Sequence, residues 1–354
     1  MLDYNDNIIK NDMEELFSCG IDFNYLRNSS VLVTGAAGMI ASYTLLFFIY
    51  LNEVKRFNIT IYAEVRNKNK LIDIFGLYLE AYYFNVLECE IPELESFHLH
   101  VDYIIHAASL ASPQYYATKP VETMLPNIIG TNSLLSMAKK KKIKAFVFFS
   151  SGSVYGSIER GNAIYEDCVG TFDFLAPGNV YGESKRCGEA ICMAYYNEYN
   201  VPVRIVRIHH TYGPTIDYKN DKRVFSSFIR NIIEEKNIEM LSDGMAKRAF
   251  CYITDMISGM LVIMNRGENG GVYNLANTKE YVSIKSLAQI LVGLSPGKQL
   301  SVEFKTEEER NYCPSKEKRI LPVDCSKVED IGWKPKVSLE DGLRRTIEYL
   351  KAYF

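Results

Sequence analysis

The chain lacks a strong excess of charge of either sign. Its 354 residues hold 40 lysines and arginines against 43 aspartates and glutamates, for a net charge of −3. Binding to a nucleic-acid backbone needs a basic surface, and the only dense basic run is Lys139–Lys142. At the end of an expected helix, lysines suit the negative end of the helix dipole. We therefore expect no nucleic acid among the partners.

The chain also lacks paired cysteines, a signal segment and a long apolar run. Its eight cysteines are scattered without a C-x-x-C pair, which argues against zinc or a disulfide framework and predicts reduced thiols and no bound metal. Met1–Glu15 lacks the positive region and the apolar region of a secretory signal. Leu45–Leu51 is far shorter than the roughly 20 residues of a membrane span. These absences favour a cytoplasmic protein with no membrane partner.

What the sequence does contain is an alternation of apolar strands and helices. Near-continuous apolar runs separated by helices predict a parallel sheet that helices cover on both faces. The expected strands are 31–33, 59–63, 101–106, 145–149 and 203–208. The expected helices are 39–51, 70–76, 121–142, 224–235, 254–264, 283–292 and 339–351. The fold class is thus α/β, with a doubly wound, Rossmann-type parallel sheet that binds ligands at the carboxyl ends of its strands.

A glycine-rich turn, residues 34–38, joins the first expected strand to a helix. Glycine lets the backbone approach a pyrophosphate, and the N-terminus of the following helix stabilises the negative charge. Ala41 takes the third small position of the dinucleotide-binding pattern. A tight turn without a ligand is the alternative. We expect a dinucleotide cofactor to be bound by Gly35, Ala37, Gly38, Met39 and Ile40.

The end of the second expected strand gives conflicting signals about the cofactor. A carboxylate there binds the ribose 2′-hydroxyl of NAD, whereas an arginine accommodates the 2′-phosphate of NADP. The chain has Glu64 and Arg66 at this point. We favour NAD, leave NADP open, and place Arg66 at the cofactor.

Tyr181 and Lys185 lie four residues apart, which on a helix places them on one face. A neighbouring ammonium favours the phenolate and lowers the pKa of a phenol, which is normally about 10. A phenol that exchanges its proton near neutral pH is a general acid and base. The spacing alone also fits an ordinary packed tyrosine. Its meaning depends on the glycine turn and on Ser151, which ends an earlier strand.

Six motifs occur in a fixed order: residues 34–38, 106–109, 127–131, 150–156, 181–185 and 248–255. With these motifs the chain resembles the extended short-chain dehydrogenase/reductases, in the nucleotide-sugar epimerase/dehydratase group. The resemblance runs from about residue 29 to the closing Gly332-Trp333-x-Pro335. Among subgroups, Ala111-Ser112-Pro113, Tyr115-Tyr116 and Arg248-Ala249-Phe250 look most like UDP-glucuronate decarboxylases.

The resemblance implies a catalytic group of Tyr181, Lys185 and Ser151. The tyrosine takes a proton from a sugar hydroxyl, usually at C4, while hydride passes to the nicotinamide. The lysine lowers the phenol pKa and binds the nicotinamide ribose, and the serine orients the sugar oxygen. Further cofactor contacts are expected from Ala107, Ala108, Ser109, Asn127 and Ser150. Contacts to a nucleotide-diphosphate sugar are expected from Ser112, Ser153, His210, Arg223, Arg248 and Arg319.

Two positions after the expected catalytic serine depart from the family pattern. Family dehydratases carry an Asp-Glu pair there, and decarboxylases carry a glutamate at the second position. This chain has Gly152 and Ser153, neither of which can act as a carboxylate base. We therefore expect an epimerase or a 4-ketoreductase. A 4,6-dehydratase or a decarboxylase-type lyase stays open, because Glu166, Asp167 and Glu183 could supply a carboxylate. A non-catalytic NAD(P)-binding regulatory protein is a remote alternative.

A second departure is His209-His210, where the family usually has Phe-Asn. His210 could donate to a diphosphate, more strongly if protonated. Arg223 and Arg248 are expected to grip the same group, because a guanidinium gives phosphate two hydrogen bonds. Adjacent residues on a strand face opposite sides, so the two histidines are not expected to share a metal ion.

The length and the motifs together predict more than one domain. Residues 1–28 form an N-terminal extension, and 29–212 form the NAD(P)-binding domain, to which 249–268 return. Residues 213–248 and 269–354 form a smaller α/β substrate-binding domain. By resemblance, we expect a homodimer held by two long helices from each subunit.

Overall fold

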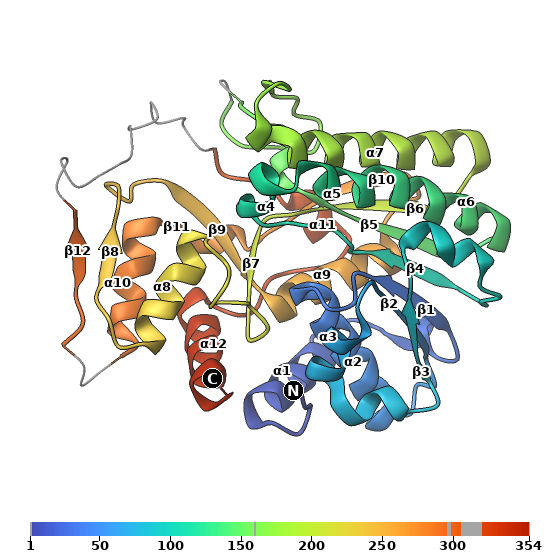
Figure 1. Cartoon of the computed structure of the whole chain (residues 1–354), viewed down its shortest axis with the longest axis horizontal. Helices are drawn as coiled ribbons and strands as arrows, with labels where there is room; N and C mark the ends of the chain where they lie inside the picture. Colours follow the sequence, from blue (N-terminus) through green and yellow to red (C-terminus); the bar gives the residue numbers. More distant parts are fainter. Residues whose placement is uncertain (1, 159–160, 296–298, 306–320, 354) are drawn as a thin grey trace.

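The molecule is built on a seven-stranded parallel sheet, as the sequence predicted (Figure 1). This computed structural model describes residues 2–158, 161–295, 299–305 and 321–353. The strand order is β10-β6-β5-β4-β1-β2-β3. In chain order the strands are β1 (Ser30–Thr34), β2 (Thr60–Val65), β3 (Phe84–Glu88), β4 (Tyr103–His106), β5 (Ala145–Ser151), β6 (Val203–Ile208) and β10 (Gly271–Leu275).

Helices cover both faces of this sheet. One face carries α2 (Met39–Glu53) and α9 (Ile253–Arg266), which also touch each other. The other face carries α7 (Val180–Tyr199), beside α5 (Pro120–Leu125) and α6 (Thr131–Lys141). Helix α3 (Lys68–Phe75) follows β2. The burial of α2 is complete from residue 41 to residue 52, which explains its near-uniform apolar sequence.

The smaller C-terminal part forms the opposite end of the molecule in Figure 1. It has a three-stranded sheet of β7 (His210–Tyr212), β9 (Lys247–Tyr252) and β11 (Tyr281–Ser283). A two-stranded sheet pairs β8 (Ile238–Met240) with β12 (Val302–Phe304). Its helices are α8 (Val224–Ile233), α10 (Ile284–Gly293) and α12 (Leu339–Tyr353), whereas α11 (Ser326–Asp330) packs against β10 of the large sheet.

Three elements differ from the sequence-based expectation. The prediction assigned residues 269–354 to the smaller domain, but β10 extends the large sheet by pairing in parallel with β6. The expected helix 121–142 is divided into α5, a π-helical turn (Pro126–Gly130) and α6, because proline cannot donate the backbone hydrogen bond that a regular helix requires. Strand β3 was not predicted, since its position at the sheet edge leaves its sequence only partly apolar.

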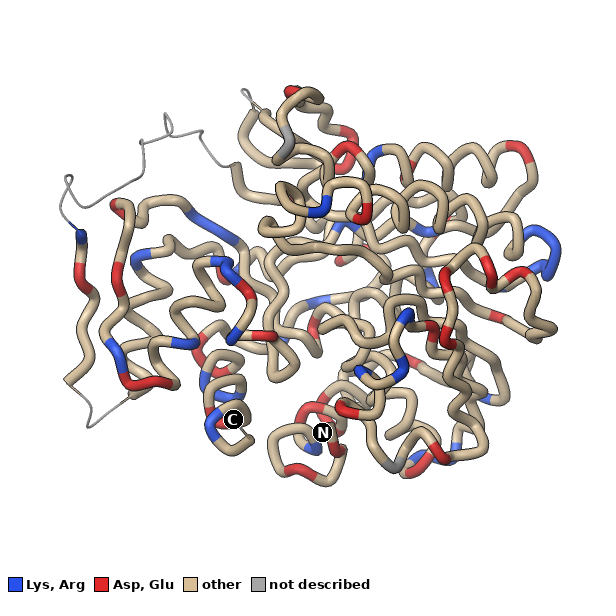
Figure 2. Tube along the Cα trace, viewed as in Figure 1, with Lys and Arg blue, Asp and Glu red and all other residues tan. Residues whose placement is uncertain are grey.

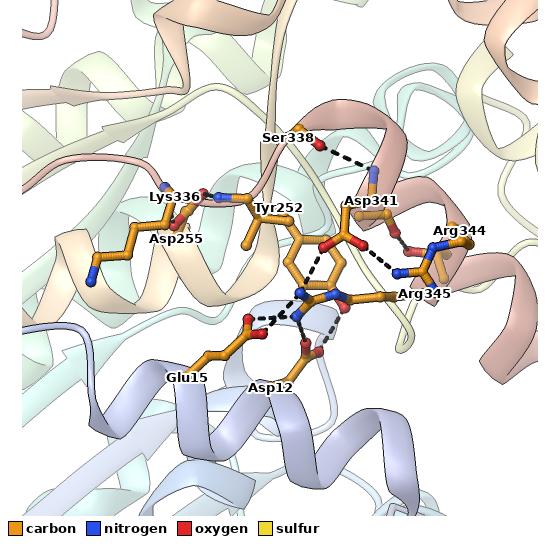
Figure 3. A network of polar contacts seen from close by, with 12 residues as sticks. Asp12, Glu15, Tyr252, Asp255, Lys336, Ser338, Asp341, Arg344 and Arg345 are labelled. Carbon is orange, nitrogen blue, oxygen red and sulfur yellow. Dashed lines mark hydrogen bonds and ion pairs between the residues drawn. The ribbon is translucent and has the colours of Figure 1, made fainter.

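The N-terminal extension contains a helix, α1 (Asn7–Phe17), that joins both parts of the molecule. Its Asp12 carboxylate is fully buried and accepts hydrogen bonds from Tyr43 on α2 and from Tyr252 on β9. The Arg345 guanidinium of α12 lies 2.8 Å from the same carboxylate and 2.7 Å from Glu15 (Figure 3). Four elements far apart in sequence therefore meet at one side chain.

Within the described residues, no helix is long and apolar enough to cross a lipid bilayer.

Candidate active site

The glycine turn forms a cradle that a side chain would fill. Gly35 has φ of +64°, and a Cβ there would lie 2.6 Å from the Cα of Ala108. The turn is closed by a 2.8 Å hydrogen bond from the Gly38 amide to the Gly35 carbonyl. Helix α2 begins directly afterwards, at Met39, and Ile40 lies in its first turn. This bare backbone at a helix N-terminus is suited to a pyrophosphate.

Glu64, rather than Arg66, contacts the cradle. The Gly35 amide donates a 2.8 Å hydrogen bond to the Glu64 carboxylate, which is buried. Burial raises the pKa of Glu64 to about 7, and the bond from Gly35 opposes that rise. The Arg66 side chain is exposed at the start of the loop after β2. The strand end thus presents the carboxylate that suits a ribose 2′-hydroxyl.

Three buried polar atoms in residues 109–127, the segment after β4, have no hydrogen-bond partner among the described residues: Ser109 Oγ, Ser112 Oγ and Asn127 Oδ1. Asn127 is held in place because its amide donates to Thr123 and Ser184, at 3.0 Å each. Ala107 and Ala108 lie in the same segment after β4. Unsatisfied buried oxygens are costly, so this group fits a polar ligand that supplies the missing donors.

The structure brings the three expected catalytic residues together. Ser151 ends β5, while Tyr181 and Lys185 lie in the first turns of α7, both buried. Ser151 is hydrogen-bonded to the Tyr181 phenol, which helps to lower the pKa of that phenol. The Ser151 hydroxyl also donates to Ser153 at 3.2 Å. The Lys185 ammonium lies 5.8 Å from the centroid of the Tyr181 ring.

The electrostatics of this pair are set mainly by burial. Burial raises the pKa of Tyr181, and only the Ser151 hydrogen bond and the charge of Arg223 oppose that rise. Burial lowers the pKa of Lys185 to about 7, and its ammonium donates to the Phe149 carbonyl at 2.6 Å. Desolvation dominates the pKa of both groups in this arrangement, and the expectation that Lys185 lowers the phenol pKa stays a prediction.

The Ser150 side chain has a partner within the protein, and its predicted contact to the cofactor stays a prediction. Its hydroxyl donates to Glu189, whose carboxylate also forms an ion pair with Arg207, 2.7 Å apart. Successive strand residues face opposite sides of the sheet, so Ser150 points away when Ser151 points toward the phenol. The Glu166 carboxylate accepts a 2.7 Å hydrogen bond from the backbone N–H of Asn274, so it has a partner within the protein.

Three predicted substrate-binding side chains act electrostatically on one another. The charges of Arg248 and Arg223 add to burial in lowering the pKa of His210 to about 3, so this imidazole is neutral. The His210 side chain keeps solvent-exposed surface. Arg223 pairs with Asp221 at 2.6 Å, whereas no described carboxylate pairs with Arg248. Two guanidinium groups near one imidazole fit an anionic ligand.

Two further predictions concern Arg319 and a metal. Arg319 lies outside the described residues. Among the residues that are described, no group of three or more His, Cys, Asp and Glu side chains could hold a metal ion.

Sequence reasoning missed the role of Tyr116, on α4 (Pro113–Thr118). Its ring stacks on that of Tyr181, with centroids 4.8 Å apart and planes 7° apart. The sequence offered no signal for this contact beyond the resemblance that included the Tyr115-Tyr116 pair, because the two rings lie on separate helices.

Residues 31–276 match the NAD dependent epimerase/dehydratase family. The chain belongs to this family. It is 32% identical over 260 residues to UDP-glucuronic acid decarboxylase 1 of Xenopus tropicalis, which covers 73% of this chain but 59% of that protein. It is 30% identical over 320 residues to UDP-glucuronic acid decarboxylase 6 of Arabidopsis thaliana, covering 90% of this chain and 88% of that one. The chain thus spans less than two thirds of the first of these relatives.

Solved structures agree with the fold of this family member. The UDP-glucose 4-epimerase of Thermotoga maritima, with UDP-glucose, has a TM-score of 0.76 and 25% identity, covering 91% of this chain and 99% of that one. The UDP-glucuronic acid 4-epimerase of Bacillus cereus, with UDP-glucuronic acid and NAD, has a TM-score of 0.74 and 27% identity, covering 92% and 100%. The predicted Rossmann-type fold is confirmed, and NAD is the cofactor of the family.

Proposed function

We propose that this protein is an NAD-dependent enzyme that oxidises and reduces C4 of a nucleotide-diphosphate sugar, as a 4-epimerase or a 4-ketoreductase. Bound NAD supplies the hydride acceptor. The Tyr181 phenol exchanges a proton with the sugar O4, and Ser151 holds that oxygen by a hydrogen bond. The buried Lys185 ammonium, when protonated, favours the phenolate. The glycine cradle with Glu64 supports NAD rather than NADP.

The observation that supports this reaction over elimination is the packing around Gly152. A Cβ at this position would lie 2.5 Å from Cε1 and 2.6 Å from Nδ1 of His209. The imidazole therefore fills the space that a carboxylate side chain at residue 152 would need. Ser153, the next residue, offers only a hydroxyl, so neither position supplies the base for elimination. Proton transfer then rests on Tyr181.

The substrate contacts follow from the position of the cations. A sugar diphosphate carries negative charge on its phosphates, which suits Arg223, Arg248 and the neutral His210 as donors. Ser153, hydrogen-bonded to Ser151, supplies a hydroxyl group near the catalytic phenol, and Ser112, just before the helix that carries Tyr116, could supply another. We place the diphosphate at the cations and the sugar between them and Tyr181.

A UDP-glucuronate decarboxylase is the second candidate, because relatives with that name are 30–32% identical to this chain. The two candidates give different products from UDP-glucuronic acid. We expect NAD-supplied protein to convert a UDP-sugar into its 4-epimer, with no net change in nicotinamide absorbance, as proton NMR and absorbance would measure. A 4-ketoreductase would instead oxidise reduced cofactor only when a 4-keto sugar is added. Release of carbon dioxide with formation of a pentose would overturn the proposal in favour of the decarboxylase.

We also propose a homodimer in a cytoplasmic setting. Val121, Leu125 and Ile129 are 60%, 49% and 50% exposed, and their four-residue spacing forms one apolar stripe beside α7. Covering this stripe with a second copy gives the four-helix contact expected from the family resemblance.

Light scattering is expected to give about twice the chain mass of 40.4 kDa, and a monomer at micromolar concentration would contradict the proposed homodimer. The seven described cysteines, all free thiols, accord with a reducing compartment.

A further inference from the structure

The ring of Tyr116 covers one face of the catalytic phenol. It lies almost parallel to the Tyr181 ring, 7° apart, at a centroid separation of 4.8 Å. Aromatic pairs at such a separation prefer an offset stack. Tyr181 is buried and Tyr116 half-buried, so this stack separates the phenol from solvent on that side.

The backbone fixes Tyr116 in this place. Helix α4 begins with Pro113, whose ring presets the first helical residue, after Ser112 in an extended conformation. The helix packs against α5 and against the 3₁₀ turn Pro177–Asn179, which leads directly into α7. At its end, the Lys119 amide donates to the Tyr115 carbonyl at 2.8 Å. Tyr116 is thus held by the same turn that starts the catalytic helix.

One cation acts on both rings. The charge of Arg223 lowers the pKa of Tyr181 and the pKa of Tyr116, while burial raises both. The Asp221 carboxylate, which pairs with Arg223, raises the pKa of Tyr116. Both phenols are therefore shielded from solvent and lie close enough to Arg223, in the smaller part of the molecule, for its charge to act on them.

We propose that Tyr116 is a positioning residue for the reaction at Tyr181: its ring fixes the plane of the catalytic phenol and excludes water from that face. This inference rests on the proposed C4 chemistry. The final torsion of a tyrosine side chain is broad, so a phenol without a neighbour samples many planes. A parallel ring at 4.8 Å confines that torsion and so fixes the plane in which the phenol O–H bond lies, beside Ser151, while the oxygen itself stays on the rotation axis.

The proposal assigns the effect to the ring of Tyr116 and not to its hydroxyl group. Two variants distinguish the two contributions. In Tyr116→Phe the stack remains, so turnover and KM are expected to stay within about twofold of the wild type. In Tyr116→Ala the stack is lost, and kcat is expected to fall by roughly 10²-fold, with KM changed far less, because misplacement of a reacting group costs about that much. Tyr115→Ala on the same helix is the matched control, since no described ring contact joins Tyr115 to Tyr181.

A second readout does not depend on finding the right sugar. Carbon-13 NMR of tyrosine-labelled protein follows the ionisation of Tyr181, whose resonance is the one that Tyr181→Phe removes. Admitting water beside the phenol lowers its pKa, so Tyr116→Ala is expected to move that titration to lower pH and Tyr116→Phe to leave it unchanged. If no sugar is turned over by the wild type, the proposed function fails while this titration still decides the role of Tyr116.

The result that overturns the inference is a Tyr116→Ala protein that melts like the wild type, titrates Tyr181 like the wild type and retains its kcat. A loss of kcat in Tyr116→Phe equal to that in Tyr116→Ala would also overturn it, because the hydroxyl rather than the stacked ring would then be required.

Discussion

Tyr181→Phe is expected to lower turnover by roughly 10³-fold or more, since a positioned general acid and base contributes about 10²–10⁴-fold. The substitution removes one hydroxyl and retains the ring. Because residues 152 and 153 are Gly and Ser, no carboxylate at these two positions can take over the proton transfer. Turnover is measured with the substrate that the NMR experiment identifies.

NAD binding is expected to survive in the same variant. The cradle at Gly35 and the carboxylate of Glu64 lie at the ends of β1 and β2, and neither contacts the Tyr181 hydroxyl in the described structure. The stack with Tyr116 also needs only the ring. The dissociation constant of NAD, measured by calorimetry, should therefore stay within about twofold.

Tyr195→Phe is the matched control, because Tyr195 lies on the same helix and donates its hydroxyl to Asn132, at 3.2 Å. This change should leave both turnover and NAD binding intact. Undiminished activity in Tyr181→Phe would remove the catalytic assignment, and a loss of NAD binding would show that the hydroxyl has a role in the cofactor site instead.

The local chemistry of the sequence predicted much of the sheet, and the structure brings the three expected catalytic residues together. The middle of strand β1, residues 31–33, is apolar because both faces of the sheet are covered, and helix α2 is mostly apolar for the same reason. The four-residue spacing on a helix indicated the pair Tyr181 and Lys185, and the family resemblance implied that Ser151 joins them. Ser150 and Ser151 are the same residue type, so their roles could not be distinguished from the sequence. Because side chains alternate along β5, Ser150 donates to Glu189 and Ser151 contacts the Tyr181 phenol.

Features that depend on distant partners could not be predicted. Tyr116 reaches Tyr181 only because α4 packs on the turn before α7. The pKa of Lys185 depends on how deeply α7 is buried, which its spacing from Tyr181 does not reveal. Helix α1 has a polar sequence, and its burial depends on residues more than 200 positions away, such as Tyr252 and Arg345. The N-terminal extension was for that reason predicted without a role.

Arg345→Met is expected to be the most destabilising of the substitutions considered, at about 3–5 kcal/mol, because it leaves a buried carboxylate without its cation. Asp12 has no exposed surface, and only the Tyr43 and Tyr252 hydroxyls would remain beside it. Arg345 also pairs with Glu15 of α1 and with Asp341 of its own helix, so the change removes the ion pairs that join α1 to α12 (Figure 3). Urea unfolding followed by circular dichroism measures the loss.

The neighbouring residue on α12 provides the control. Arg344 makes ion pairs with Asp341 and Glu348, but all three side chains are partly exposed. Exposed pairs contribute about 0–1 kcal/mol, so Arg344→Met should change stability little. Figure 2 shows charges of both signs over this surface, so loss of one cation there leaves other charges nearby. Equal losses in the two variants would mean that burial of Asp12 does not govern the effect.

The double variant Asp12→Leu with Arg345→Met tests the same cause by another route. If the loss in Arg345→Met comes from an unpaired buried charge, removing that charge should restore part of the stability, because the two residues interact directly. Leucine cannot accept the hydroxyls of Tyr43 and Tyr252, so the recovery should be incomplete. A double variant less stable than Arg345→Met alone would contradict this explanation.

The pH dependence of Arg345→Met follows from the sign of the shift at Asp12. Burial raises the pKa of this carboxyl, while Arg345 and the two tyrosines lower it, so removing Arg345 raises it further. A folded-state pKa above the unfolded value means that stability is lost as pH rises through the folded value. The deficit of Arg345→Met should therefore be smaller in acid, where Asp12 is protonated, than at neutral pH. A deficit that does not change with pH would place the damage in lost packing of α12 rather than in the charge of Asp12.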